Sequence, residues 1–246
     1  MPYTSEKIFD FCKNKQISCS QETAGNFDVF YNLLTEFNSH TNVTALKTEE
    51  DICWKHFIDS LYPLAFSLIP DYASVIDIGC GAGFPGLPLK MLKKDINISF
   101  VDSTEKKLKF TKAISDKFSL DAKIYSARAE ELVQKGHREK YDICVSRAVA
   151  ALPVLCELCL PYVKVGGTFI AYKSLKECDL SNPESELFKA KNGILQLGGK
   201  VEKTLVCPIE ENDGTESNHA LLLIKKVKNT PDNFPRRYSV ILKKPL

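Results

Sequence analysis

A glycine-rich turn near residue 80 has the composition of a ligand-binding loop. An apolar run carries Asp77 near its end, Gly79, Gly81 and Gly83 follow, and Pro85 stands where a helix would begin. Glycine reaches positive φ and lets a ligand approach the backbone closely. The unpaired N–H groups of a helix start can donate to a polar ligand, and proline is tolerated in that first turn. The pattern predicts a strand, a tight turn and a helix N-terminus that hold a nucleotide cofactor.

Two cofactors fit this turn when Asp102 is considered with it. An acid about 20 residues after the glycines can accept hydrogen bonds from ribose hydroxyls, as in dinucleotide sites. The same arrangement fits S-adenosylmethionine. A dinucleotide places its pyrophosphate against the helix start, whereas Asp77 directly ahead of Gly79 suits a ligand that presents an ammonium group. The residues favour S-adenosylmethionine and leave a dinucleotide open.

Alternating strands and helices must position these residues. Strands are expected at 75–78, 96–101, 122–125, 141–145 and 168–172, with helices at 105–118, 152–160 and 182–197. Two late strands, 201–207 and 219–226, flank a polar turn at 210–218 that contains Asp213 and Gly214. The order predicts an α/β fold: a doubly wound, Rossmann-like sheet that is mostly parallel and has an antiparallel C-terminal hairpin.

Polar residues follow the predicted strands at one edge of this sheet. Ala129 and Glu130 come after the third strand, Arg147 ends the fourth and Lys173 ends the fifth. Ligands of open α/β sheets bind beyond the carboxyl ends of the strands. Taken singly, Asp102 could be a helix cap, and Arg147 and Lys173 could be surface charges. Because all of them fall at the same edge of the sheet, we expect them to line one ligand-binding crevice.

Three parts of the chain are distinguished by composition. Residues 1–70 form an N-terminal helical extension, 71–228 the cofactor-binding domain and 229–246 a basic C-terminal arm. In the extension, a helix over 48–64 carries a possible capping box at Thr48 and Asp51. Its polar face bears His56, Asp59 and Ser60. Pro231, Pro235 and Pro245 make the arm an extended segment rather than part of the core.

Charge and cysteine content limit the class of protein. The formal net charge is only +2, but the residues from Lys225 to Leu246 hold seven basic side chains and one acid. Nine scattered cysteines without zinc-type spacing indicate free thiols in a reducing, cytoplasmic setting and no metal site. The sequence shows no signal peptide and no apolar run near the roughly 20 residues of a membrane span. Nothing in it demands a dimer, so a monomer is expected.

The motifs together resemble the rRNA small subunit methyltransferase G (GidB) family of class I S-adenosylmethionine-dependent methyltransferases. The matching stretches are residues 42–44, 56–61, 76–88, 101–103, 128–130, 146–148, 171–173, 228–231 and 235–236. This resemblance implies methylation of N7 of a guanine in the 530 loop of 16S ribosomal RNA. It further implies cofactor contacts from Gly79, Phe84, Ala129, Glu130 and Arg147, with Asp77, Gly81 and Asp102 completing the site. Phe84 would close over the methionyl side, and Asp102 would hold the ribose.

Such a reaction needs positioning more than acid–base chemistry, because guanine N7 has a free lone pair. Arg147 and Lys173 would grip the guanine or a phosphate, with His56 and Asn42 as weaker candidates. The basic arm would contact RNA phosphates without affecting cofactor binding. The partner would be 16S rRNA, the small ribosomal subunit or an assembly intermediate. An NAD-dependent oxidoreductase and a non-catalytic RNA-binding or assembly protein remain as alternatives.

Overall fold

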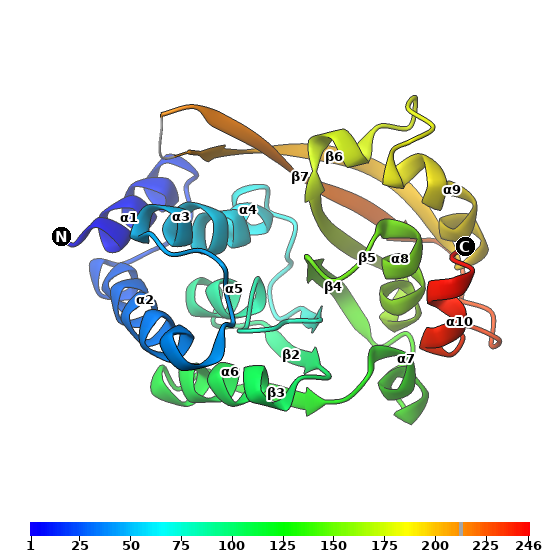
Figure 1. The fold of residues 1–246 in the computed structure, drawn as a ribbon, viewed down its shortest axis with the longest axis horizontal. Coiled ribbons are helices and arrows are strands. Elements are labelled where there is room, and N and C mark those ends of the chain that lie inside the picture. Colours follow the sequence, from blue (N-terminus) through cyan, green and yellow to red (C-terminus); the bar gives the residue numbers. More distant parts are fainter. Residues whose placement is uncertain (212–213) are drawn as a thin grey trace.

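A seven-stranded sheet forms the centre of the computed structural model, which describes residues 1–211 and 214–246 (Figure 1). The strand order is β3-β2-β1-β4-β5-β7-β6, and only β7 pairs antiparallel to its neighbours. The strands are β1 (Ser74–Ile78), β2 (Asn97–Asp102), β3 (Ala122–Ser126), β4 (Tyr141–Arg147), β5 (Val163–Ser174), β6 (Gly199–Glu210) and β7 (Glu216–Lys226). The predicted doubly wound sheet and its C-terminal hairpin are confirmed.

Helices cover both faces of this sheet. One face packs against α1 (Tyr3–Asn14), α2 (Gln21–Thr41), α3 (Glu49–Ile52), α4 (Asp59–Ala65), α5 (Gly86–Leu92) and α6 (Glu105–Lys117). The other packs against α7 (Ala129–Leu132), α8 (Leu152–Cys159), α9 (Glu186–Gln196) and α10 (Tyr238–Lys243). In β2, Phe100 joins the first core and Val101 the second, because successive strand residues point to opposite faces. None of the described helices is long and apolar enough to cross a membrane.

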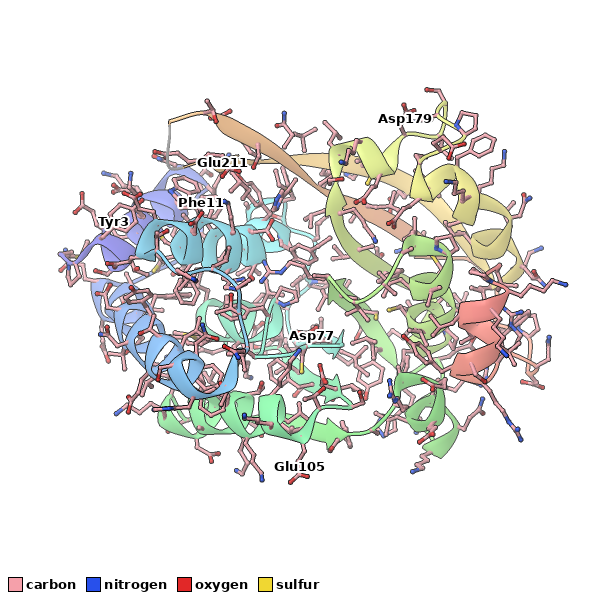
Figure 2. The ribbon with its side chains drawn as sticks, in the orientation of Figure 1. Tyr3, Phe11, Asp77, Glu105, Asp179 and Glu211 are labelled. Carbon is pink, nitrogen blue, oxygen red and sulfur yellow. The ribbon has the colours of Figure 1, made fainter. Side chains whose placement is uncertain are left out.

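The β6–β7 hairpin is longer than the sequence predicts and reaches the N-terminal helices (Figure 1). Tyr62 donates its hydroxyl to the Pro208 carbonyl at 2.5 Å, and Lys55 forms an ion pair with Glu211 at 2.7 Å. Figure 2 shows Glu211 on the same side of the molecule as Phe11 of α1. The expected turn around Gly214 joins the two strands, and its Asp213 lies outside the described residues.

The helix predicted over residues 48–64 is built from α3, a π-helical segment at Cys53–Ile58 and α4. Thr48 caps it as predicted, by accepting the Asp51 N–H at 3.1 Å. The predicted polar face is not solvated, since Asp59 and Ser60 are buried. Periodicity assigns a helix one buried side, but the polar side of this helix is covered as well, because Arg147 of β4 and His219 of β7 contact Asp59. Inserted π turns are frequent at functional sites.

A buried ion pair joins this helix to the sheet. Arg147 at the end of β4 donates to Asp59 of α4 at 2.5 Å, and His219 of β7 lies 3.0 Å from the other Asp59 oxygen. Burial alone would raise the pKa of Asp59, but the His219 hydrogen bond and the Arg147 charge outweigh burial and lower it. Asp59 therefore stays ionised and holds three elements together: the extension, the parallel sheet and the hairpin.

The C-terminal segment, residues 229–246, folds back onto the domain, so the expectation of an extended arm is wrong. Phe234 and Ile241 are buried in the second core, and α10 packs beside α8 (Figure 1). Arg236 forms an ion pair with Glu157 at 2.6 Å, and Glu157 is fully buried. The prolines keep most of the segment non-helical, but its apolar side chains supply enough contact to dock it.

Replacing Arg236 with Ala is expected to lower the free energy of unfolding by about 3 kcal/mol, because Glu157 is left buried without its cation. The Arg236 backbone N–H still donates to Glu157, which keeps the loss at the lower end of the usual range. Urea denaturation measures the loss. The matched control is Arg237→Ala at the neighbouring exposed position, expected to change stability by less than about 0.5 kcal/mol. Equal stability of the two variants would contradict the buried ion pair.

Stability should depend on pH through His219, whose pKa is raised mainly by its hydrogen bond to Asp59. A raised folded pKa stabilises the protein fully below about pH 6.5, and this contribution disappears as pH rises through the folded pKa. His219→Gln should therefore cost more free energy of unfolding near pH 6 than near about pH 8.5. The exposed His40→Gln variant is the control. A loss for His219→Gln that is the same at both pH values would refute the coupling.

Candidate active site

A cavity of about 260 Å³ lies at the carboxyl ends of the parallel strands, the edge expected from the sequence. Of the predicted site residues, four line it: Gly79, Asp102, Ala129 and Glu130. The others do not, namely Asn42, His56, Asp77, Gly81, Phe84, Arg147 and Lys173. The remaining lining residues are Ile78, Val101, Ser103, Lys107, Ala127, Arg128, Ala148, Val149, Leu158 and Tyr238. A second cavity of about 410 Å³ includes Ser74, Asn97 and Ala122, at the amino ends of the strands. Because the glycine turn follows β1, the cavity at the carboxyl ends of the strands is the candidate site.

The glycine turn reaches the cavity through Gly79 and has the predicted conformation. Gly79, Gly81 and Gly83 have φ values of +71°, +56° and +90°. A Cβ atom on Gly79 would lie 2.3 Å from a methyl carbon of Val149, which closes the wall from the β4–α8 loop. Gly81 is different, because the nearest atom to a Cβ there would be 3.9 Å away on Lys107. Gly79 is thus required both by its φ and by a close neighbour.

Asp77 is a buried carboxylate with one oxygen free. It is fully buried near the middle of the molecule (Figure 2), and its Oδ2 accepts the Gly86 N–H at 2.8 Å. Its Oδ1 has no hydrogen-bond partner among the described residues. Burial raises the pKa of Asp77 to about 7, although the Gly86 hydrogen bond and the Arg147 charge lower it. An unpartnered buried oxygen is costly, so this atom fits a ligand that brings a cationic donor.

Asp102 ends β2 and holds the turn as well as facing the cavity. Its two oxygens accept the Gly81 N–H at 2.9 Å and the Thr104 N–H at 2.7 Å. The helix-cap interpretation is therefore partly right, because the second bond shapes the chain that leads into α6. A carboxylate has about four acceptor positions. Asp102 can thus stabilise the turn and still accept from hydroxyl groups of a ligand.

Ala129 and Glu130 are the first residues of the short helix α7, which follows β3. Both line the cavity on the β3 side, whereas the glycine turn follows β1. Tyr162 of the second core donates its hydroxyl to the Ala129 carbonyl at 2.6 Å. This bond fixes the backbone that presents Glu130. Arg128, immediately before them, also lines the cavity. The structure therefore places a fixed backbone segment and a carboxylate in the part of the cavity that follows β3.

Phe84 is packed differently from the expectation that it covers the cofactor. It is 7% exposed and stacks between Phe30, with ring centroids 5.4 Å apart, and His56, at 4.6 Å. It is absent from the residues that line the cavity. In this conformation Phe84 joins the glycine turn to the N-terminal extension, and its closure over a ligand stays a prediction.

His56 is held as a neutral imidazole. Its Nε2 lies 2.7 Å from the Thr44 hydroxyl, and its Nδ1 lies 3.4 Å from an Arg147 nitrogen. Burial, together with the Arg147 charge, lowers the pKa of His56 to about 3. The ring therefore carries no charge at physiological pH. His56 is packed against Phe84 rather than solvated, and its place in the substrate site stays a prediction.

Arg147 and Lys173 are engaged with the protein itself. Besides Asp59, the Arg147 guanidinium donates to the carbonyls of Lys55 and His56 at 3.1 and 3.4 Å. The Lys173 ammonium donates to the Ala150 carbonyl at 2.9 Å and pairs with Glu186 at 2.6 Å. The surface-charge interpretation is wrong for both. In this conformation their donors hold neighbouring loops.

Asn42 ends α2 in the left-handed conformation, with φ of 51°, and its side chain is exposed. The adjacent loop is fixed by Asn38, whose side chain makes two hydrogen bonds of 3.0 Å with the Thr44 backbone. Asn42 is therefore a helix C-cap in the structure. Its proposed contact with the substrate stays a prediction.

Sequence reasoning missed two contributors to the site. Val149 had no motif to mark it, because its role is to fill the space left by Gly79. Tyr238 lies in the segment expected to be an arm, more than 100 residues from the motif around Ala129. The hydrophobic residues within the basic tail, among them Phe234, Tyr238 and Ile241, were the available signal that the tail packs against the domain.

Comparison with known proteins agrees with this geometry. The family model for GidB, rRNA small subunit methyltransferase G, matches residues 24–206. Proteins named ribosomal RNA small subunit methyltransferase G from Clostridium botulinum (strain Loch Maree / Type A3) and Clostridium tetani (strain Massachusetts / E88) are 40% and 38% identical over 237 residues. Each alignment covers 96% of this chain and 95% of the relative.

Solved structures support the fold. A SAM-dependent methyltransferase from Methanosarcina mazei has a TM-score of 0.52 at 15% identity, over 68% of this chain and 98% of that one. The M. jannaschii protein TYW2, solved in complex with AdoMet, has a TM-score of 0.54 at 12% identity, over 76% and 80%. Likeness at this identity concerns the fold alone. From the family model and the near full-length relatives, the chain belongs to the rRNA small subunit methyltransferase G family.

Proposed function

We propose that this protein transfers a methyl group from S-adenosylmethionine to N7 of a guanine in the 530 loop of 16S ribosomal RNA. Membership of the family supports an rRNA methyltransferase. The observation that carries the cofactor assignment is the buried, unpartnered Oδ1 of Asp77 beside the glycine turn. The ammonium of an amino-acid ligand would satisfy that oxygen, whereas a pyrophosphate would be repelled by it.

Residues in the cavity and next to it share the binding of this cofactor. Asp77, fully buried in β1 beside the glycine turn, receives the ammonium. The Gly79 backbone in the cavity wall allows close approach, and Asp102 accepts from the ribose hydroxyls. Ala129 and Glu130 contact the adenine edge. When bound, S-adenosylmethionine supplies an electrophilic methyl group on a sulfonium. Arg147 contributes indirectly, because its charge lowers the pKa of Asp77 and so favours the carboxylate that binds the ammonium.

The acceptor requires little acid–base chemistry from the protein. Guanine N7 has a lone pair at neutral pH, and methylation leaves the base positively charged. A neutral His56 near the reacting end, stacked on Phe84, avoids repulsion with that charge. Because Arg147 and Lys173 are paired internally, we propose that they position other parts of the site. Arg147 holds α4 through Asp59, and Lys173 holds the loop after β4 and the start of α9. Catalysis then rests on orientation of the reacting groups.

The RNA must present its guanine outside a regular duplex. N7 lies in the major groove, which is deep and narrow in A-form RNA. The target is therefore a loop base or a flipped base. Exposed Arg237, Lys243 and Lys244 on the C-terminal segment are candidates for phosphate contacts. The partner is 16S rRNA, free or within the small ribosomal subunit or an assembly intermediate. We further propose a cytoplasmic monomer.

Asp77→Asn should bind S-adenosylmethionine at least about tenfold more weakly, because the amide offers no negative charge to the ammonium. It should also lower methylation of 16S rRNA at limiting cofactor. Transfer of a labelled methyl group to 16S rRNA and to small subunits measures the activity, and calorimetry measures the affinity. The control is Asp116→Asn on the exposed side of α6. Unchanged affinity in Asp77→Asn would remove the basis for the cofactor orientation.

The reaction itself is tested by mapping N7-methylguanine on 16S rRNA from cells with and without the gene for this chain. The expected result is loss of one modified guanine in the 530 loop. An identical map would reject the proposed reaction and leave a non-catalytic RNA-binding protein. Binding of NAD in place of S-adenosylmethionine would instead favour the oxidoreductase alternative.

A further inference from the structure

The C-terminal helix α10 contributes an aromatic side chain to the cofactor cavity. Tyr238, the first residue of α10, lines the same cavity as Gly79, Asp102 and Glu130. Its ring lies 5.3 Å from the guanidinium carbon of Arg128, which also lines the cavity. Leu158 of α8 lines it as well. One part of the cavity is therefore an apolar and aromatic pocket beside the Glu130 carboxylate.

Tyr238 is held in place by anchors on both sides along the chain. Two residues before it, Arg236 makes three side-chain hydrogen bonds of 2.6–3.2 Å with Glu157, which is fully buried. Three residues after it, Ile241 is fully buried in the second core. Such anchors leave little backbone freedom between them. Tyr238 is therefore a pre-positioned wall rather than the tip of a mobile arm.

The start of the C-terminal segment is also fastened to the domain. Thr230 donates its N–H to Glu139 at 2.7 Å and its hydroxyl to the Leu197 carbonyl at 2.8 Å. The buried Lys226 donates to the Thr230 hydroxyl at 2.7 Å. At the far end, a Cβ atom on Gly193 of α9 would lie 2.6 Å from Leu246. These contacts fasten residues 229–246, which we call the C-terminal strap, across the second face of the sheet.

We propose that residues 229–246 form part of the cofactor site, with Tyr238 as the aromatic wall of the adenine subsite. This inference rests on the proposed use of S-adenosylmethionine. Tyr238 lies with Arg128 and Glu130, the residues that follow β3, and this is the end of the cavity assigned above to adenine. A purine offers a π face to such a ring, and stacking on an aromatic side chain is independent of polar contacts at the base edge.

The proposal changes the role expected for this segment. A basic tail that only touched RNA could be removed without effect on the cofactor. Here, removal would open one wall of the cavity and expose the side chains of the second core that Phe234 and Ile241 cover. The match to the family model ends at residue 206, well before Tyr238. The cofactor site is therefore complete only when residues 229–246 have docked onto the domain.

Two ligands allow the adenine subsite and the ammonium subsite to be tested independently. S-adenosylhomocysteine carries both the adenosine and the amino-acid ends, whereas 5′-methylthioadenosine lacks the ammonium and carboxylate. Isothermal titration of the full chain with each ligand gives two dissociation constants for every variant. Tyr238→Ala should weaken both ligands by a similar factor of about tenfold, the effect of losing one stacking platform. Asp77→Asn should weaken only S-adenosylhomocysteine.

Two further variants distinguish stacking from a structural defect. Tyr238→Phe keeps the ring and should bind both ligands within about twofold of the unsubstituted protein, because stacking needs no hydroxyl. Leu242→Ala changes a 51% exposed side chain on the same helix and should leave both affinities unchanged. Thermal unfolding of each variant confirms that the free proteins are folded at the titration temperature.

Equal affinities of Tyr238→Ala and the unsubstituted protein for 5′-methylthioadenosine would overturn the inference while leaving the proposed function intact. A loss confined to S-adenosylhomocysteine would also overturn it, because Tyr238 would then act at the amino-acid end. Failure of the unsubstituted protein to bind either ligand would reject the proposed cofactor, and the adenine subsite with it.

Discussion

The buried ion pair between Arg147 and Asp59 is the interaction on which the arrangement of this protein depends. Arg147 ends a central strand, Asp59 lies on the helix of the extension, and His219 of the hairpin completes the cluster. A charge removed from water is tolerated only when its partners are well placed. The three elements must therefore meet with correct geometry before any of these groups can be buried. This requirement fixes the N-terminal helices against the edge of the sheet where the parallel strands end.

Two buried carboxylates near this edge, Asp59 and Asp77, have opposite pKa shifts. The difference distinguishes a carboxylate whose partners all come from the protein from one that lacks a partner for one oxygen. Asp59 has two cationic neighbours, and its pKa is lowered. Asp77 has one backbone hydrogen bond, a free oxygen and a pKa raised to about 7. The first carboxylate is fully used by the fold. The second is left incompletely satisfied, a cost that a native structure carries where a ligand supplies the missing partner.

Three basic side chains of this chain position neighbouring segments from within the fold. Arg147, Lys173 and Arg236 each pair with a carboxylate and bond to or support neighbouring segments. Arg and Lys residues suggest contacts with phosphate when only the sequence is considered. In the folded protein, removing the partner of a buried charge costs far more than removing the partner of an exposed one. What remains for RNA are exposed side chains such as Arg237, Lys243 and Lys244.

The sequence by itself determined the parallel sheet, its antiparallel hairpin, the glycine turn and the set of strand-end residues, because these depend on local periodicity and backbone conformation. Gly79, Asp102, Ala129 and Glu130 do line one cavity, as the rule for strand ends predicts. Only the tertiary structure decided the burial of Asp59, the internal pairing of Arg147 and Lys173, and the docking of the C-terminal strap that carries Tyr238. These outcomes depend on contacts between residues far apart in the chain, and a side chain's surroundings are invisible to local patterns until those contacts form.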